Sequence, residues 1–246
     1  MSRRVFGRTI RWAIPSPGVL KALSILERSD PYLDEFLGLA GADDVLLDVG
    51  ANSGIYSILC ALGQTAPRHV IAIEPAPPVL DLLLKNLYLN RLGNRIQVIA
   101  AAAGETDGFV ELTLPTTDPS VGTVRVQSGA EAARIVPRGA LWRLEPGRVW
   151  IPIRAIDSLV EQGTIPPPTV VKVDVEGFEA SVLRGMRRAL ASSVRVLLLE
   201  LHHTLLPPGE TAERVTAILH EAGLREWRSA LRLGNQSHIL FARPTT

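Results

Sequence analysis

Cysteine, surplus charge and long apolar runs are all scarce in this chain of 246 residues. The single cysteine, Cys60, excludes a disulfide within the chain and a metal site built from several cysteines. The formal net charge is only +1, so composition gives no support for a nucleic-acid partner. No run of 18 uninterrupted apolar residues occurs, so no membrane span is expected. These absences favour a soluble cytoplasmic protein in which Cys60 is a buried structural thiol.

An apolar fraction of 46% predicts a sizeable core, and the length suits one large α/β domain with an extension. We expect residues 45–246 to form that domain. Residues 1–44 precede its first strand and contain two predicted short helices, 19–27 and 32–39. This segment is either a packing cover for the sheet or a lid over a ligand pocket.

Apolar strands alternate with amphipathic helices from residue 45 onward. Strands are predicted at 45–47, 69–73, 97–102, 169–173 and 194–199, with a last pair near 225–232 and 238–242. Helices are predicted at 55–62, 77–90 and 215–222. This order predicts a parallel sheet covered on both faces, with an antiparallel hairpin at its end. Residues 103–157 break the rhythm: two runs, 109–112 and 150–154, alternate like strands on either side of a long predicted loop.

A glycine-containing turn, Asp48–Gly54, joins the first predicted strand to the first helix of the domain. A strand, a glycine turn and a helix in this order are typical of a nucleotide-binding unit. Asp48, however, ends the strand where a pyrophosphate would meet the helix N-terminus, and its charge would repel phosphate. A cofactor with an ammonium and a sulfonium group suits the turn better, which indicates S-adenosylmethionine. Gly50 and Gly54 would let the backbone approach this ligand, and Asn52 or Ser53 would hydrogen-bond its carboxylate. Asp48 would attract its ammonium group directly or through water.

Later strand ends supply the rest of the predicted cofactor site. Glu74 lies twenty residues after Gly54 and is placed to accept both hydroxyls of a ribose. Ala102 belongs to a run of small residues against which adenine could lie. Asp174 ends the fourth strand, beside the expected methionine part of the cofactor. The predicted cofactor contacts are Asp48, Gly50, Ala51, Asn52, Gly54, Tyr56, Glu74, Pro75, Ala102 and Asp174.

The catalytic candidates are Asp174, Glu176 and His202, because each could take a proton from an acceptor at the carboxyl edge of the sheet. His202 and His203 point to opposite sides of an extended chain, and His202 shares the parity of Glu200. Asp174, Glu176, Glu200 and His202 could also ligate a divalent ion together. Nothing in their spacing fixes a geometry, so no metal is assigned.

Several of these segments resemble the FkbM family of S-adenosylmethionine-dependent methyltransferases. The matching segments are Asp48–Gly54, Ile73–Pro75, Gly104–Gly108, Ile156–Leu159 and Lys172–Gly177. The resemblance implies a class I methyltransferase, Rossmann-like fold: a seven-stranded α/β sheet in the order 3-2-1-4-5-7-6. It implies that Asp48, Gly50, Asn52, Gly54 and Glu74 bind the cofactor, with Asp174 near the reacting end. Residues 107–127 and 1–44 have no matching signature and are expected to shape the acceptor pocket.

The resemblance also implies methyl transfer to a hydroxyl oxygen of a sugar, polyketide or other secondary metabolite. An N-methyltransferase is one alternative, but the typical Asn/Asp-Pro-Pro-aromatic turn is replaced here by Asp174–Gly177. An NAD-dependent oxidoreductase is another, and the acid at Asp48 argues against it. The expected partner is therefore a small-molecule acceptor and not a nucleic acid, with a homodimer left open.

Overall fold

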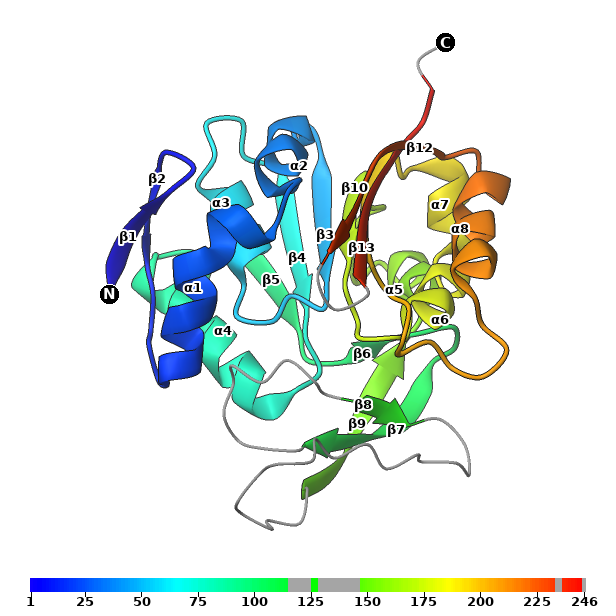
Figure 1. The fold of residues 1–246 in the computed structure, drawn as a ribbon, viewed down its shortest axis with the longest axis horizontal. Helices are drawn as coiled ribbons and strands as arrows, with labels where there is room; N and C mark the ends of the chain where they lie inside the picture. The colour runs from blue at the N-terminus through cyan, green and yellow to red at the C-terminus, as the bar shows by residue number, and fades with distance from the viewer. Residues whose placement is uncertain (115–124, 128–146, 233–235, 245–246) are drawn as a thin grey trace.

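Seven strands form the central sheet of the computed structural model, which describes residues 1–114, 125–127, 147–232 and 236–244 (Figure 1). Across the sheet they are β12 (Arg225–Arg232), β13 (Gln236–Ala242), β11 (Val196–His202), β10 (Val170–Val173), β3 (Val45–Val49), β4 (His69–Ile73) and β5 (Ile96–Ile99). The five strands from β11 to β5 run parallel, and β13 is antiparallel to both of its neighbours. Numbered along the domain, this order is 3-2-1-4-5-7-6, which confirms the predicted class I fold.

Each face of the sheet has its own hydrophobic core, because successive strand residues point to opposite sides. Leu46 and Leu198 pack with one set of helices, and Leu47 and Leu199 pack with the other. The first set is α1 (Pro17–Ser29), α2 (Leu33–Leu39), α3 (Ile55–Ala61) and α4 (Pro77–Leu89). The second set is α5 (Ile156–Glu161), α6 (Glu179–Arg184), α7 (Arg187–Ser192) and α8 (Ala212–Glu221). The sequence patterns did not predict α5, α6 or α7.

The N-terminal segment begins with a β-hairpin that the sequence analysis missed. Strands β1 (Ser2–Val5) and β2 (Arg8–Arg11) pair across the turn Phe6–Gly7, whose two residues have positive φ angles of 44° and 76°. Asn90, which follows α4, hydrogen-bonds to the backbone of Arg11 at the end of β2, and Asn86 of α4 accepts from the Ala13 amide just beyond it. The hairpin is therefore anchored to the first face of the sheet. Its buried apolar side chains are Val5, Ile10 and the following Trp12.

A second, smaller sheet occupies the region that broke the strand–helix rhythm. Its order is β6 (Ala102–Ala103), β9 (Gly147–Arg154), β7 (Gly108–Leu114) and β8 (Arg125–Gln127). The two runs that alternate like strands are thus confirmed, and they pair antiparallel with each other. The predicted loop between these runs was wrong at 125–127, which form β8, and the strand predicted at 97–102 is divided between β5 and β6. Most of the Gly- and Pro-rich stretch lies outside the described residues. Figure 1 shows this sheet below the central one.

The helices of the described ranges include none that is both long and apolar enough to cross a membrane.

Candidate active site

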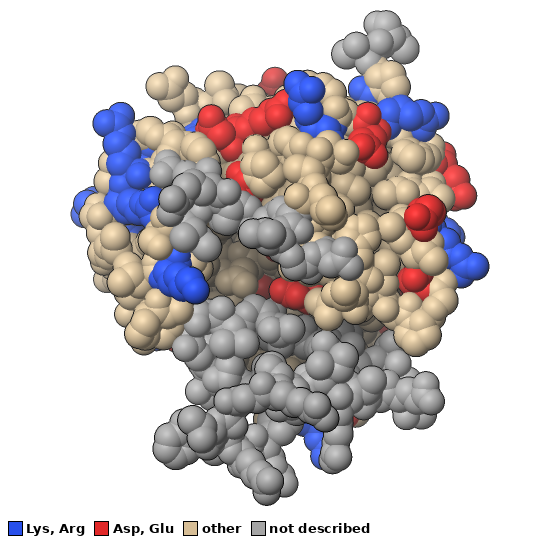
Figure 2. All heavy atoms as spheres, in the orientation of Figure 1, with Lys and Arg blue, Asp and Glu red and all other residues tan. Residues whose placement is uncertain are grey.

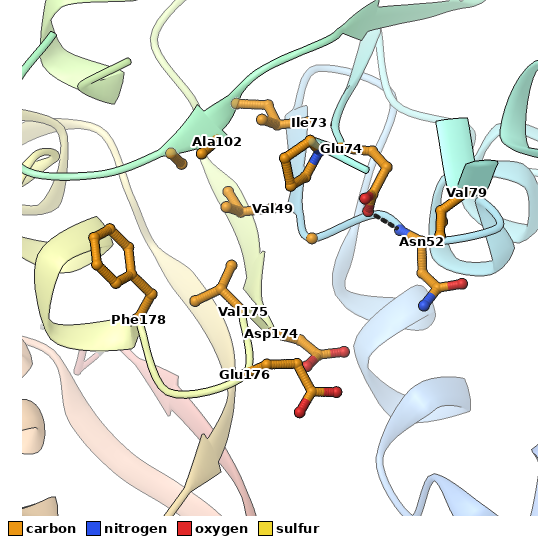
Figure 3. A pocket seen from close by; sticks show the side chains of 13 residues that line it. Val49, Asn52, Ile73, Glu74, Val79, Ala102, Asp174, Val175, Glu176 and Phe178 are labelled. Atoms are coloured by element: carbon orange, nitrogen blue, oxygen red, sulfur yellow. Dashed lines mark hydrogen bonds between the residues drawn. The ribbon is translucent and has the colours of Figure 1, made fainter. Parts of the chain in front are cut away.

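A cleft of about 640 Å³, open to solvent, lies at the carboxyl ends of β3, β4 and β10 (Figure 3). Figure 2 shows the hollow near the middle of one face of the molecule, with acidic atoms visible inside it. One part of the wall is apolar and the other is acidic. The lining residues are Val49, Gly50, Asn52, Ile73, Glu74, Pro75, Val79, Ala102, Ala103, Asp174, Val175, Glu176 and Phe178.

Glu74 directly follows β4, near Asn52, and is only 6% exposed. Its Oε2 accepts a hydrogen bond from the Asn52 amide and its Oε1 accepts one from the Ala76 amide, both at 2.9 Å. Burial raises the pKa of Glu74 to about 7, although these two hydrogen bonds oppose the rise. Each carboxylate oxygen keeps a further acceptor position, so Glu74 can still bind a diol from the cleft.

The backbone of the Asp48–Gly54 turn is tightly packed against the protein itself. A Cβ atom on Gly50, whose φ is +73°, would lie 1.8 Å from the Asp174 carbonyl oxygen. A Cβ atom on Gly54 would lie 2.4 Å from a methyl carbon of Leu83. Gly54 therefore makes room for α4 and not for a ligand, contrary to the prediction. Gly50 fits the turn against β10 while still lining the cleft.

The amide groups of this turn are already used. The N–H groups of Gly50 and Ala51 both donate to the Ile73 carbonyl at 3.0 Å, and the Asn52 N–H donates to Glu74. A phosphate would need such N–H groups to point outward. The engaged amides, and not the field of Asp48, therefore make this turn a poor phosphate cradle.

Asp48 does not line the cleft, so its predicted attraction of the ammonium group is not a direct contact, and the alternative through water stays a prediction. Its side chain is fully buried, and Oδ2 accepts hydrogen bonds from the Ser57 backbone N–H and hydroxyl at 3.1 and 2.7 Å. Its Oδ1 lies 3.7 Å from Lys172 Nζ. Burial raises the pKa of Asp48, against the opposing effects of Lys172 and Ser57. Asp48 thus holds the start of α3 and pairs with a buried lysine.

Lys172 joins the two strand ends that border the cleft. Its Nζ donates to the Gly50 carbonyl at 2.9 Å and to Asp174 Oδ2 at 3.1 Å. Burial alone would lower the pKa of Lys172, but Asp174, Asp48 and Glu200 raise it above its usual range. Lys172 therefore stays charged and orients Asp174 at the rim. The sequence analysis assigned no role to it, although a lysine between valines in a buried strand requires an anionic partner.

Beside Asp174, an imidazole lies at the centre of a group of carboxylates. His202 Nε2 is 3.6 Å from Glu176 Oε2 and 3.8 Å from oxygens of both Asp174 and Glu200. Its Nδ1 lies 2.8 Å from Glu179 Oε1. Burial lowers the pKa of His202, but the hydrogen bond to Glu179 and the neighbouring acids outweigh this and raise it to about 9. His202 is therefore an imidazolium near neutral pH.

The three catalytic candidates are brought together, but they are not equivalent. Asp174 and Glu176 line the cleft, with side chains 26% and 28% exposed, whereas His202 is 2% exposed and lies behind them. Burial raises the pKa of Glu176 to about 7; His202 opposes the rise, while Asp174 and Glu200 add to it. Glu176 has a φ of +53°, a strained conformation of the kind concentrated at functional sites. The geometry thus places a proton acceptor at the rim and a cation behind it.

No metal is assigned to this cluster. Ligand-type atoms of Asp174, Glu200 and His202 lie within 4.8 Å of one another. However, the second oxygen of Asp174 already accepts from Lys172, and the second oxygen of Glu200 lies 3.0 Å from His238 Nε2. These bonds hold the carboxylates toward protein cations.

Other predicted contacts lie outside the cleft wall. Ala51 is buried in the turn, and Tyr56 is buried with its hydroxyl donating to Asp30 and its ring 5.1 Å from Lys172 Nζ. Cys60 is buried as expected, and burial raises the pKa of its thiol to about 12. The apolar wall was missed for the most part: Phe178, Val79 and Ile73 carry no signal that separates them from core residues.

Comparison with protein families matches the methyltransferase FkbM domain to residues 48–226. The chain belongs to the FkbM methyltransferase family. Its relatives include the hexuronic acid methyltransferase AglP of Haloferax volcanii, 30% identical over 224 residues that cover 91% of this chain and 81% of the relative. Methyltransferase sdnD of Sordaria araneosa is 28% identical over 193 residues, which cover 72% of each chain.

Solved structures agree with the fold. The methyltransferase FkbM structure from Methylobacillus flagellatus has a TM-score of 0.54 and 18% identity, and the match covers 93% of this chain. The match covers 56% of that longer chain. A precorrin-6y C5,15-methyltransferase from Geobacter metallireducens has a TM-score of 0.50 at 14% identity. The protein is thus an S-adenosylmethionine-dependent methyltransferase of the FkbM family, and the alternative of an NAD-dependent oxidoreductase is set aside.

Proposed function

We propose that this FkbM-family protein transfers a methyl group to a hydroxyl oxygen of a small molecule, and that a sugar is the first acceptor class to test. Support for the sugar comes from the relative AglP, which is described as a hexuronic acid methyltransferase. The observation that favours a hydroxyl group as the methyl acceptor is the Glu176 carboxylate at the rim of the cleft, with a pKa of about 7. An alcohol becomes a good nucleophile only when a base shares its proton, and Glu176 can do this near neutral pH.

The cleft suits the donor S-adenosylmethionine, which supplies an electrophilic methyl group when bound. Glu74, buried at the end of β4, would accept the ribose hydroxyls. Val79, Ala102 and Ile73 offer the adenine an apolar surface. Asp174 and Asn52 would bind the ammonium and carboxylate groups at the acidic part. The cleft wall thus offers an apolar surface, a diol acceptor and charged groups, the three kinds of contact that S-adenosylmethionine needs.

On this proposal each rim residue has a separate task. Lys172 holds Asp174 in place, so Asp174 orients the donor. Glu176 accepts the proton of the acceptor hydroxyl and passes it to solvent. His202, charged and buried, partly offsets the acidic neighbours of Glu176 and so limits the rise of its pKa to about 7. His202 is then a positioning residue, and Glu176 is the base among the three candidates that the sequence left open.

A transfer assay with labelled methyl donor tests this proposal across sugars, phenols, macrolides, lipids and amines. We expect label in a hydroxyl-bearing product, formed at a rate that falls as the pH drops below about 7. Label found only on amine acceptors would replace O-methylation with N-methylation, the alternative left open by sequence. Calorimetry with S-adenosylhomocysteine tests the binding of the methyl donor independently of the acceptor, and micromolar affinity is expected.

A further inference from the structure

Two charged residues outside the matched family region meet behind the active site. Asp30 follows α1 in the N-terminal segment, and His238 lies on β13 near the other end of the chain. His238 Nδ1 is 3.3 Å from Asp30 Oδ1, and both side chains are buried. The position of Asp30 is fixed further by hydrogen bonds from the Tyr56 hydroxyl and the Tyr32 amide. A buried acid held by three partners has a defined orientation.

The contact continues from His238 to the acids of the cleft. Glu200 and His238 are direct partners in the register of β11 and β13, and Glu200 Oε2 is 3.0 Å from His238 Nε2. The other oxygen of Glu200 lies 3.8 Å from His202 Nε2, which is 3.6 Å from Glu176. Asp30 is thus connected to the rim through charged side chains that lie no more than 3.8 Å apart.

The charges along this connection alternate in sign. Asp30 and Glu200 flank His238, and Glu200 and Glu176 flank His202. Burial lowers the pKa of His238, but the neighbouring carboxylates of Asp30 and Glu200 raise it to about 9. Ala230, its partner on β12, adds no charge, and the next charged groups are Lys172 and His202 beside Glu200. His238 is therefore a cation whose charge depends on two acids.

We propose that Asp30 is a positioning residue of the methyltransferase: it keeps His238 in place and charged, and His238 in turn orients Glu200 against His202 behind Glu176. This assigns the N-terminal segment a part in the active site beyond packing against the sheet. The proposal rests on the proposed role of Glu176, so its test needs one measurement that does not depend on methyl transfer.

The test combines Asp30→Asn with histidine titration by NMR and with the pH profile of kcat in the full chain. In the wild-type protein we expect His238 to titrate near pH 9. In Asp30→Asn we expect its pKa to fall by about one unit, because one of its two carboxylate partners is lost. The alkaline decline of kcat should move to lower pH by a similar amount, with KM for the donor changed less than twofold. Asp30→Glu should restore both values toward wild type.

Asp44→Asn is the matched control, because Asp44 is 8% exposed like Asp30 but pairs with Arg195 away from the cleft. It should leave the His238 titration and the pH profile unchanged. If Asp30→Asn fails to fold, His238→Gln replaces it, and loss of the alkaline decline supports the proposal. A shifted His238 titration with an unshifted pH profile overturns the positioning role. An unshifted titration overturns the contact itself, whether or not Glu176 is the base.

Discussion

Two groups of buried charges lie at opposite ends of the same parallel strands, and they differ in how well their charges balance. At the amino ends, Asp44 before β3, Thr169 before β10 and Arg195 before β11 form one hydrogen-bonded group. Burial would raise the pKa of Asp44, but hydrogen bonds from Arg195, Gly41 and Thr169 outweigh it and lower the pKa. In this group the single negative charge of Asp44 is balanced by the single positive charge of Arg195.

At the carboxyl ends the acids are in excess. Among the described residues, six carboxyl groups surround one lysine and two histidines: Asp30, Asp48, Asp174, Glu176, Glu179 and Glu200 against Lys172, His202 and His238. The pKa of Glu176 is raised by burial and by its acidic neighbours instead of lowered by a base. A balanced group of charges thus stabilises the scaffold, whereas a group with surplus acids is able to bind a cationic ligand or a proton.

The largest expected effect is that of Asp174→Ala. Turnover should fall to background, at least about a thousandfold, because both donor orientation and the partner of Lys172 are lost. The fold should survive, since Asp174 is at the rim. Initial rates with a confirmed acceptor, together with a circular dichroism spectrum, check this. Wild-type turnover would end the assignment of Asp174 to the site.

Glu176→Gln should separate activity from stability most clearly. We expect kcat to fall about a hundredfold and to lose its decline below pH 7, because the base is gone. Stability at pH 8 should rise by about 1 kcal/mol, since a surplus charge that is partly exposed is removed. Rates and thermal unfolding are the measurements. A rate still falling below pH 7 would assign the base elsewhere.

Asp44→Asn should show the opposite pattern at the amino ends. The free energy of unfolding should drop by about 2 kcal/mol, a value discounted because the Arg195 side chain is 42% exposed. The kcat value at 20 °C, well below the unfolding transition, should stay within twofold of wild type. Denaturant unfolding measures the change in stability, and the transfer assay measures kcat. A large fall in kcat would make the contrast between the two groups invalid.

Glu74→Gln should weaken the binding of the methyl donor alone. We expect the affinity for S-adenosylhomocysteine to fall about tenfold, because charge-assisted hydrogen bonds to the ribose become neutral ones. In the wild-type protein the affinity should also decline as the pH drops through about 7, where Glu74 takes up a proton. Calorimetry at several pH values measures both. Equal affinities for both proteins at pH 8 would place the ribose elsewhere.

The last expected effect is a steady loss of stability as the pH rises. Glu74 and Glu176 bind protons more tightly in the folded state, with pKa values near 7, so their contribution is lost from about pH 4.5 to 7. His202 and His238, with pKa values raised to about 9, contribute fully below about pH 6.5 and lose this as the pH rises through 9. Thermal midpoints measured from pH 5 to 9.5 should fall throughout. A maximum near pH 8 would contradict the surplus of acids.

The parallel sheet with its terminal hairpin and the acidic strand ends could be predicted from sequence because both follow local rules, whereas the strand order came from the resemblance to the FkbM family. Apolar runs alternate with helical periodicity, and the carboxyl ends of parallel strands meet at one edge. Glu74, Asp174 and Glu176 therefore lie where they were expected. The hairpin at 2–11 was missed because its strands are short and rich in arginine.

What could not be predicted is which residues share a buried contact across long separations. Nothing local links Asp30 with His238, and only the register of β11 and β13 brings Glu200 to them. Asp48 looked like a ligand contact because its place in the strand was known but its partners, Ser57 and Lys172, were not. Side-chain pairing thus depends on the tertiary structure.

The lack of space beside Gly50 has a consequence for how this protein can change over generations. The turn after β3 and the turn after β10 touch so closely that even one methyl group does not fit between them. The two halves of the cleft therefore cannot diverge separately in a lineage: a substitution in one turn is tolerated only if the other moves with it. In a library with every residue at Gly50, only glycine should support methyl transfer. The same library at Gly93, where nothing lies within 4 Å of a Cβ atom, should tolerate many residues.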